Sequence, residues 1–414
     1  MPRRSPPEVR ERVWACRKQG WSLDRIAHET GLNRDTVRSI LGRHRPGGVQ
    51  GQEAARAAQE ATQTAVQQER ARAIRDAQAA ELRRLTARRA VIEEWRDAIH
   101  QAALTVTPPG LVALPAQAPF GEEEAVLLLG DVHLGQATPP RLTAGWTQDT
   151  ETTEGQVRVL GEALLRLWEL QAGAAPWRTL HLLCLGDLVE GSGMRTSQAR
   201  QVDLLAVQQA GAAGRAVASL VLTALQRFEH VTLDAVPGNH GRTSQQAGPA
   251  GLAELDPADS FDWLAIEFAG EILRAAVEAG RVEIRNHQQY YGTLEVAGHR
   301  VVLEHGSSLR GGSSWGGIPY YGVDRTSAAY RDLLGDYTVL ALGHFHRPYE
   351  LPSAYGGMVV GNGAFPPTTP FTVATRHQAT RPSQTLLSIH PRRGVTMIRR
   401  LYLDTPREGP APPA

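Results

Sequence analysis

The sequence has few cysteines, a single lysine and no long apolar segment. Its 414 residues include only Cys16 and Cys184, which are too few for a disulfide framework or a thiolate-rich zinc site. No run approaches the ~20 apolar residues of a membrane span, so we expect no membrane partner. The basic opening residues lack the apolar core of a signal peptide, which predicts a cytoplasmic protein. Lys18 is the one lysine in an arginine-rich set of basic residues, a bias that fits a GC-rich genome and indicates no particular function.

One apolar run, from Ala125 to Leu129, ends abruptly in Gly130-Asp131-Val132-His133. Such a run predicts a buried strand, and the period of two places the carboxylate and the imidazole on the same side of the chain. A single Asp-x-His is a weak signal, because short strands often end in Asp. The signal becomes more specific because the same pattern occurs again later in the chain. Four more apolar runs stop at Gly or Pro beside Asp, Asn or His, within residues 181–187, 231–240, 301–306 and 339–346.

In α/β sheets, ligands bind where strand ends converge. The five ends could bring together two Asp, one Asn and several His, a donor set that suits Mn, Fe, Ni or Zn. Two such ions about 3.5–4 Å apart could share a bridging hydroxide and clamp a phosphoryl group for in-line attack. No Ser or Cys nucleophile is evident. Cys184 lies inside an apolar run, where a small core residue is expected.

The motifs Asp-x-His, Gly-Asp, Gly-Asn-His, His-Gly and Gly-His-x-His occur in this order between residues 125 and 365. With them the chain resembles the calcineurin-like metallophosphoesterase superfamily. The resemblance implies an α/β fold, a four-layer α/β/β/α sandwich, and two divalent metal ions, with manganese expected to serve in vitro. One ion would be held by Asp131, His133 and His346, and the other by Asn239, His305 and His344, with Asp187 bridging the two.

The same resemblance makes His240 an imidazole that holds no metal and meets the substrate phosphate or the leaving oxygen. Members usually have an acid after Gly-Asn-His, whereas Gly241-Arg242 follows here. Arg242 is therefore a candidate phosphate contact. Arg195, in a polar loop after Asp187, could pair with a phosphate, although a solvated surface loop is an equally good interpretation.

A glycine-rich stretch, residues 306–321, separates two of the predicted ligands and is typical of a mobile flap. Its Arg310, Trp315 and Tyr320 could contact a nucleic-acid strand. His287 and His299 are expected to be ordinary surface histidines. A helix over residues 203–227 should pack on the sheet, and residues 386–389 and 395–403 predict a terminal hairpin.

Residues 6–44 predict three short helices. Ser22 can cap the second, residues 23–30, and Gly31-Leu32-Asn33 can turn into the third, residues 34–41. This arrangement resembles the helix-turn-helix of resolvases and transposases. Residues 1–45 hold 11 Lys+Arg and 5 Asp+Glu, a net charge of +6, which leaves −5 for the rest of a chain of net charge +1. The asymmetry favours DNA as the partner, although a protein-docking module is the alternative. The candidate DNA contacts are Asn33, Arg34, Asp35, Thr36 and Arg38, with Arg43 and Arg45 at phosphates.

Residues 53–104 contain no Pro or Gly and predict a helix about 75 Å long at 1.5 Å per residue. Leu85, Ile92 and Ile99 lie seven apart with Trp95 between them, which predicts a coiled-coil seam and a homodimer; a solvated connector is the alternative. The predicted domains are 1–45 (helix-turn-helix), 46–106 (spacer), 107–122 (linker), 123–404 (enzyme) and 405–414 (disordered tail).

Three functions are compatible with this organisation. The first is a metal-dependent phosphodiesterase that acts on DNA as a nuclease, with a phage or prophage replication or repair role. The second is a phosphomonoesterase or a small- or cyclic-nucleotide phosphodiesterase whose arm serves assembly. The third is a DNA-binding regulator with residual activity. The complete ligand set argues against the third, and the N-terminal arm favours the first over the second.

Overall fold

Three parallel apolar strands lie side by side and end at the same edge of a sheet. They are β1 (Glu124–Leu129), β2 (Thr179–Cys184) and β3 (His230–Ala235). Their register aligns Leu129 with Cys184 and Cys184 with Ala235, so the segments that follow all begin at one edge. The computed structural model describes residues 5–43, 121–143, 145–173, 175–194, 198–243, 256–309, 317–353, 356–376 and 379–404, with single residues and short runs between 65 and 97.

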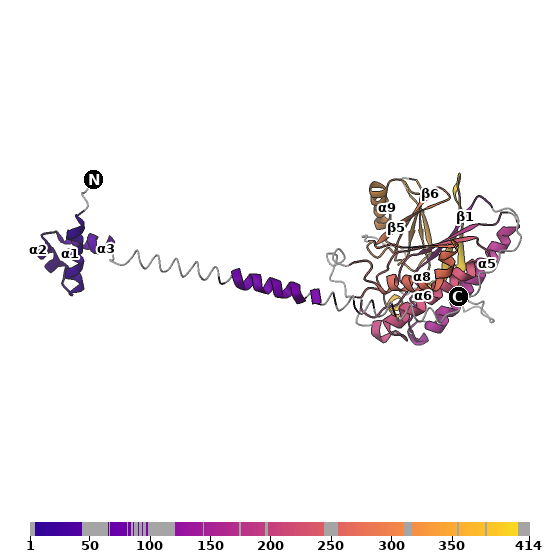
Figure 1. Cartoon of the computed structure of the whole chain (residues 1–414), viewed down its shortest axis with the longest axis horizontal. Helices are drawn as coiled ribbons and strands as arrows, with labels where there is room; N and C mark the ends of the chain where they lie inside the picture. Colours follow the sequence, from indigo (N-terminus) through magenta and orange to yellow (C-terminus); the bar gives the residue numbers. More distant parts are fainter. Residues whose placement is uncertain are drawn as a thin grey trace. The chain divides into compact units, whose positions relative to one another are not determined.

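The larger of two compact units, Trp95–Ala414, contains two sheets (Figure 1). The first has the order β11-β10-β1-β2-β3-β4, completed by β4 (Val282–Asn286), β10 (Ser383–His390) and β11 (Gly394–Tyr402). The second has the order β5-β6-β7-β9-β8 and consists of β5 (Tyr291–Val296), β6 (His299–Glu304), β7 (Val339–Leu342), β8 (Tyr349–Pro352) and β9 (Met358–Gly361). Strands β10 and β11 form the predicted terminal hairpin, which joins the sheet because β10 pairs with β1.

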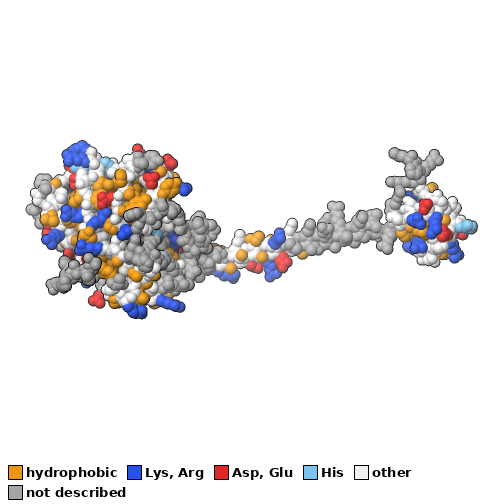
Figure 2. Space-filling model, turned by 180° about the vertical axis from the view of Figure 1, so that it is seen from behind, with side chains coloured by type: hydrophobic (Ala, Val, Ile, Leu, Met, Phe, Trp, Pro, Cys, Tyr) orange, Lys and Arg blue, Asp and Glu red, His pale blue; other side chains and the backbone are white. Residues whose placement is uncertain are grey.

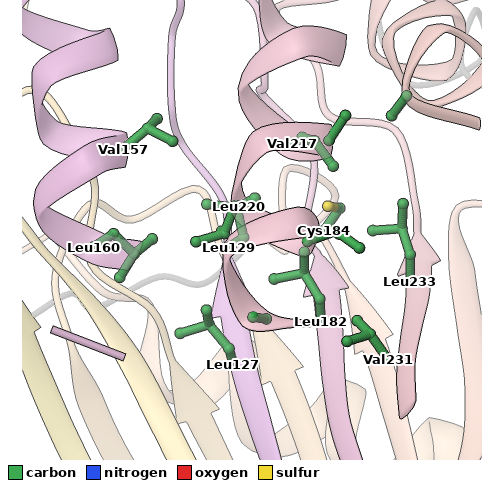
Figure 3. Packing of buried hydrophobic residues seen from close by; sticks show 14 of the residues in the cluster. Leu127, Leu129, Val157, Leu160, Leu182, Cys184, Val217, Leu220, Val231 and Leu233 are labelled. Carbon is green, nitrogen blue, oxygen red and sulfur yellow. The ribbon is translucent and has the colours of Figure 1, made fainter. Parts of the chain in front are cut away.

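Strand β1 is buried on both faces, which explains why Ala125 to Leu129 are apolar without a polar break. Strands β2 and β3 are also buried but include the polar residues His181, Thr232 and Asp234. Leu127 and Leu129 face the helices α5 (Thr150–Ala172) and α6 (Ala206–Ala224) in one apolar cluster (Figure 3). Val126 and Leu128, on the opposite face, pack with residues of the second sheet. The prediction of a helix near residues 203–227 is confirmed by α6, and Cys184 is a fully buried core residue as predicted.

The remaining helices of this unit cover other surfaces of the sheets. Helix α8 (Phe261–Glu278) packs against α6 and β4, and α9 (Tyr320–Leu334) contributes Val323 to a third cluster with Val302 and Leu340 of the second sheet. A short helix, α10 (Pro370–Arg376), and two 3-10 turns, Pro140–Leu142 and Gln198–Arg200, complete the described elements. The predicted mixed α/β class is thus confirmed as two sheets with helices.

The smaller unit, Met1–Glu94, begins with α1 (Pro7–Lys18), α2 (Leu23–Thr30) and α3 (Arg34–Arg43). Val13, Ile26, Val37 and Ile40 form its core. The oxygen of Ser22 accepts the Arg25 N–H at the start of α2, and Gly31 ends that helix with φ of 67°, so both predicted turn residues are confirmed. The described residues between 65 and 97 are helical, whereas the seam residues Leu85, Ile92, Trp95 and Ile99 lie outside the described residues.

Candidate metal centre

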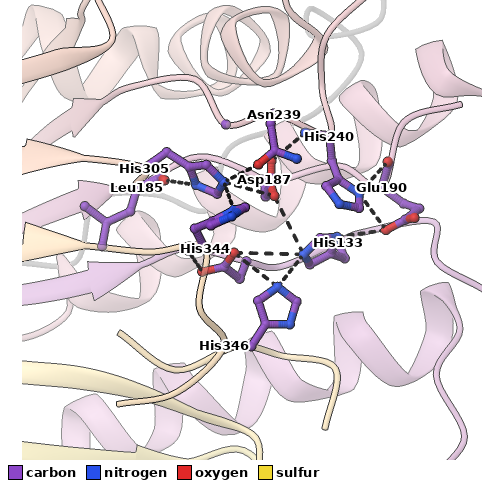
Figure 4. Close-up of polar contacts among 12 residues, drawn as sticks. His133, Leu185, Asp187, Glu190, Asn239, His240, His305, His344 and His346 are labelled. Carbon is purple, nitrogen blue, oxygen red and sulfur yellow. Dashed lines mark hydrogen bonds and ion pairs between the residues drawn. The ribbon is translucent and has the colours of Figure 1, made fainter. Parts of the chain in front are cut away.

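The predicted ligands come together where five strands end. Asp131 and His133 follow β1, Asp187 follows β2, and Asn239 and His240 follow β3. From the second sheet, His305 follows β6, while His344 and His346 follow β7 (Figure 4). The segments after β1 and β2 are joined by backbone hydrogen bonds. The Asp131 N–H donates to the carbonyl of Gly186 at 3.1 Å, and the His133 N–H donates to the backbone carbonyl of Asp187 at 3.0 Å. Parallel strands therefore carry the side chains to one place.

Asp131, His133 and His346 form the first group, with one ligand atom of each within 4.8 Å of the others. The Nε2 atoms of His133 and His346 are 3.1 Å apart, and His346 Nε2 lies 3.3 Å from Asp131 Oδ1. The backbone N–H of His344 donates to both oxygens of Asp131, at 2.9 and 3.1 Å, and so fixes the carboxylate. This is the donor set expected for the first ion.

Asp187, His305 and His344 form the second group under the same distance condition. His305 Nε2 lies 3.1 Å from Asp187 Oδ2, 3.0 Å from Asn239 Oδ1 and 3.3 Å from His344 Nδ1. Asp187 Oδ2 is also 3.9 Å from His133 Nε2. Asp187 therefore lies between the two groups, where a bridging carboxylate would be required. His133, Asp187 and His240 form a further triple, which places His240 beside the pair.

The contacts of His305 show that this donor set fits a cation. Its Nδ1 lies 2.8 Å from the carbonyl of Leu185, which can only accept, so Nδ1 carries a hydrogen. Its Nε2 then faces a carboxylate oxygen, an amide oxygen and another ring nitrogen, and lone pairs in this arrangement require a proton or a cation between them. Burial lowers the pKa of His305, but Asp187 and Asp131 outweigh burial and raise it to about 9.

The backbone is strained where these side chains begin. Among the described residues, six non-glycine residues have positive φ, and five of them belong to this centre. Their φ values are 51° (Asp131), 48° (His133), 50° (Asp187), 71° (His344) and 56° (His346). The left-handed conformation costs roughly 1–2 kcal/mol per residue, and such strain concentrates at functional sites. The chain accepts this cost where it directs the ligands inward.

Glu190 belongs to the centre, although no role was predicted for it. It is 3% exposed, and its Oε2 lies 2.8 Å from His133 Nδ1 and 3.2 Å from His240 Nδ1. Burial raises the pKa of Glu190, but His240 and His133 outweigh burial and lower it to about 2. The carboxylate thus contacts and orients both rings. Its spacing, three residues after Asp187, was the available signal.

Asp262 was also missed, and it holds two of the ligand loops together. It is 1% exposed, in the first turn of α8, and accepts the backbone N–H groups of Asp187, Leu188, Val189 and Gly238 at 2.8–3.1 Å. Burial and the charge of Asp187 raise the pKa of Asp262 to about 6, whereas the four donors favour its charged form.

Gly238 is expected to tolerate no side chain. A Cβ at this position would overlap Oδ1 and the backbone N of Asp187. We expect Gly238→Ala to lower the free energy of unfolding by about 3 kcal/mol or to displace Asp187 and abolish metal binding. The matched control is Gly155→Ala in α5, where a Cβ would meet only Arg158 at 3.6 Å and should stabilise the helix by up to about 1 kcal/mol. Urea unfolding measures the free energy of unfolding of both variants. A small change of the same size in the two variants would contradict the close packing of Gly238 against Asp187.

The other predicted contacts are placed as follows. Arg242 is buried, and its Nη2 lies 3.4 Å from Ser307 Oγ. It lies beside Pro237, Gly238 and Tyr290 and does not line the cavity of the metal centre. Burial lowers the pKa of its guanidinium.

Arg195, Arg310 and Trp315 lie outside the described residues. Tyr320 packs against Tyr349, with ring centroids 6.2 Å apart.

His287 lies 3.1 Å from Asp234, and His299 lies 2.9 Å from Thr338, so both histidines make their contacts away from the centre.

In the three-helix unit, the oxygen of Asn33 accepts the Thr36 N–H at 2.7 Å and caps α3. Arg34 pairs with Asp24 and Arg38 with Asp35, both at 3.2 Å. Basic and acidic side chains are accordingly interspersed on this unit (Figure 2). The side chains of Arg43 and Arg45 lie outside the described residues.

A cavity of about 550 Å³ opens onto the centre. Its wall includes His133, Asp187, Glu190, Asn239, His240, His344 and His346. A substrate in this cavity would thus meet both groups of ligands and the ring of His240. No described helix is long and apolar enough to span a membrane.

No family model and no curated protein matches the sequence. Solved structures that resemble the chain include Vps29 of Entamoeba histolytica in complex with zinc, with 16% identity, 68% of this chain and 99% of that chain covered, and a TM-score of 0.28. A predicted phosphoesterase of Streptococcus pneumoniae TIGR4 has 9% identity, coverage of 69% and 98%, and a TM-score of 0.27. A novel archaeal phosphodiesterase has 11% identity, coverage of 67% and 98%, and a TM-score of 0.30.

Proposed function

We propose that the protein is a two-metal-dependent phosphodiesterase that hydrolyses DNA, in a four-layer α/β/β/α sandwich of the calcineurin-like metallophosphoesterase type. The observation that carries the proposal is the convergence of seven side chains with oxygen or nitrogen donors, Asp187 among them, from five strand ends. The apolar clusters on both faces of the first sheet support the layered arrangement. Carboxylate, amide and imidazole donors suit Mn, Fe, Ni or Zn.

Asp131, His133 and His346 would hold one divalent ion, Asn239, His305 and His344 the other, and Asp187 both. Bound ions would supply Lewis-acid activation of a phosphoryl oxygen and a nucleophile at neutral pH. Asp187 would balance their charge, and its position is fixed because its Oδ1 accepts the His240 N–H at 2.7 Å. The buried carbonyl and carboxylate partners of His305 and His133 orient the rings.

His240 would act on the leaving oxygen. Its ring lines the cavity, and its Nδ1 is held by Glu190 at 3.2 Å and by Gln198 at 3.1 Å. A proton delivered to the substrate would therefore come from Nε2. The anionic Glu190 would stabilise the ring in its charged form before that transfer.

The three-helix unit would bring the enzyme to DNA. Its support is the net charge of +6 in residues 1–45 and a capped α3 that carries Arg34 and Arg38 at exposed positions. Contacts between such arginines and DNA phosphates would raise the affinity for DNA, although the arginines would take no part in hydrolysis. The long helix would serve as a spacer in a homodimer.

Purified full-length protein with Mn should be tested on single-stranded DNA, duplex DNA and bis-p-nitrophenyl phosphate. Cleavage of DNA that a chelator stops and Mn restores would support the proposal. Turnover of the small diester or of a phosphomonoester alone would instead favour a small-substrate phosphatase or phosphodiesterase with an assembly arm. Metal binding without turnover of any of them would favour a DNA-binding regulator.

The DNA-binding role of α3 predicts a specific loss. We expect the double variant Arg34→Gln/Arg38→Gln to bind DNA at least about tenfold more weakly and to reduce the slope of log affinity against log salt by about 2, because two phosphate contacts are lost. Hydrolysis of bis-p-nitrophenyl phosphate reports on the enzyme unit in the same preparation. The matched control, Arg70→Gln/Arg72→Gln in the long helix, should retain the affinity. Unchanged affinity and salt slope in the first variant would remove the helix-turn-helix from the proposal.

A further inference from the structure

Beside the metal centre, the lining of the cavity includes a set of uncharged hydrogen-bonding side chains. They come from segments far apart in the sequence: the segment after β1, the 3-10 turn at Gln198–Arg200, and the residues around α10. These side chains are Gln136, Gln198, Gln201, Thr369, Thr372 and Thr380. Amide and hydroxyl groups both donate and accept, so this wall can match a ligand with several hydroxyl or amide groups.

We propose that this wall is the binding site for the nucleoside portion of a phosphodiester substrate, which rests on the phosphodiesterase function proposed above. The charges of the lining agree with such a ligand. The carboxylates in the described lining, Asp187 and Glu190, both face histidines, and Arg347 is the one arginine there. A single phosphodiester charge at the metal centre with a neutral nucleoside beside it fits this distribution better than a polyphosphate does.

Gln136 provides the most specific evidence. It is 2% exposed, lines the cavity, and its buried side-chain oxygen has no hydrogen-bond partner. Buried amide oxygens are almost always paired, so this unpaired oxygen, in a side chain that lines the cavity, calls for a donor. A sugar hydroxyl or a base amino group would supply one. The backbone N–H of Gln136 donates to His133 O at 2.9 Å, which fixes this amide relative to a predicted metal ligand.

Phe345 adds an apolar surface to the same cavity. It lies between His344 and His346 in the sequence and lines the cavity, with its ring edge-on to His344 at 5.3 Å. Aromatic rings at such positions stack on bases with little dependence on sequence. A base would thus lie on Phe345 while the sugar or base edge meets the amide and hydroxyl wall.

The size of the cavity limits the form of the substrate. A volume of about 550 Å³ holds a drug-sized group, comparable to one nucleotide. A base paired within a duplex cannot enter such a space unless it leaves the stack. The substrate would therefore be a strand end or an unpaired nucleotide.

The test compares two chromogenic diesters with full-length protein and Mn: the p-nitrophenyl ester of thymidine 5′-monophosphate, and bis-p-nitrophenyl phosphate, which has no sugar. We expect the wild type to favour the nucleoside ester at least about tenfold in kcat/KM. Gln136→Leu should lower this ratio about tenfold, through KM, since one hydrogen bond to the nucleoside is lost. Thr380→Val should lower it about threefold, and the exposed control Gln226→Leu should leave the ratio unchanged.

Two results would overturn the nucleoside site while leaving the phosphodiesterase in place: no preference in the wild type, or equal losses on both esters in Gln136→Leu and Thr380→Val. Failure of the wild type to hydrolyse either diester would instead reject the phosphodiesterase itself. Thermal unfolding checks that each variant folds. If Gln136→Leu does not fold, the ratio measured for Thr380→Val decides.

Discussion

Asp187→Asn should reduce the turnover of bis-p-nitrophenyl phosphate by about 1,000-fold or more, a barrier increase of about 4 kcal/mol. Asp187 belongs to the second ligand group and also lies near the first, with Oδ2 3.1 Å from His305 Nε2 and 3.9 Å from His133 Nε2. An amide of the same size keeps the packing but removes the charge that would balance two cations. The measurement is steady-state kinetics with Mn, together with metal content by mass spectrometry.

The matched control for this substitution is Asp332→Asn, at an exposed position of α9. It should retain wild-type turnover and metal content. Thermal unfolding of both variants separates loss of chemistry from loss of fold. Full turnover in Asp187→Asn, with a normal unfolding curve, would contradict the assignment of a bridging carboxylate.

Metal binding should be strongly linked to pH between 7 and 9. Asp187 and Asp131 outweigh burial and raise the pKa of His305 to about 9, so the metal-free ring is protonated at pH 7. A metal ion binds only the neutral ring. Apparent affinity should therefore rise about ninefold from pH 7 to 8 and about fivefold from pH 8 to 9, about 50-fold in all, and binding at pH 7 should release about one proton. Burial lowers the pKa of His344 to about 3 and lowers that of His133, so neither ring opposes this trend.

In the metal-free protein, the raised pKa of His305 also links the stability of the fold to pH. A raised pKa means that protonated His305 contributes stability that is complete below the pKa of about 6.5 in the unfolded chain and is lost as pH rises through about 9. Calorimetric titration with Mn in two buffers of different ionisation enthalpy gives the proton count. His305→Gln should abolish the pH slope, and His299→Gln, away from the centre, should retain it. An affinity independent of pH between 7 and 9 would refute this account.

Apolar periodicity was sufficient to predict the strands that carry the centre. The run before Asp131 lacks a polar break because β1 is buried between helices and a second sheet. The runs before Asp187 and Asn239 are mostly apolar for the same reason, although they include the buried His181, Thr232 and Asp234. The position of each ligand then followed from the end of a strand. The left-handed backbone at Asp131 and Asp187 could not be predicted, because Asp gives no signal comparable to Gly.

Residues that act on the ligands from a distance in sequence were missed for a physical reason. Asp262 supports Asp187 and Gly238 from the start of a helix 75 residues beyond Asp187, and no local pattern records that approach. The cavity wall around Thr369 and Thr380 likewise depends on the return of the chain after β9. Arg242, predicted as a phosphate contact, is buried with its Nη2 beside Ser307 and is not among the residues that line the cavity.

The central claim is that side chains at five strand ends hold two divalent ions with Asp187 between them. Anomalous diffraction from Mn-soaked crystals, recorded at the manganese absorption edge, tests it most directly. Two peaks about 3.5–4 Å apart are expected. One should lie against Asp131, His133 and His346 and the other against Asn239, His305 and His344, with Asp187 touching both. No peak at this position, or manganese bound only at sites remote from Asp187, would contradict the claim.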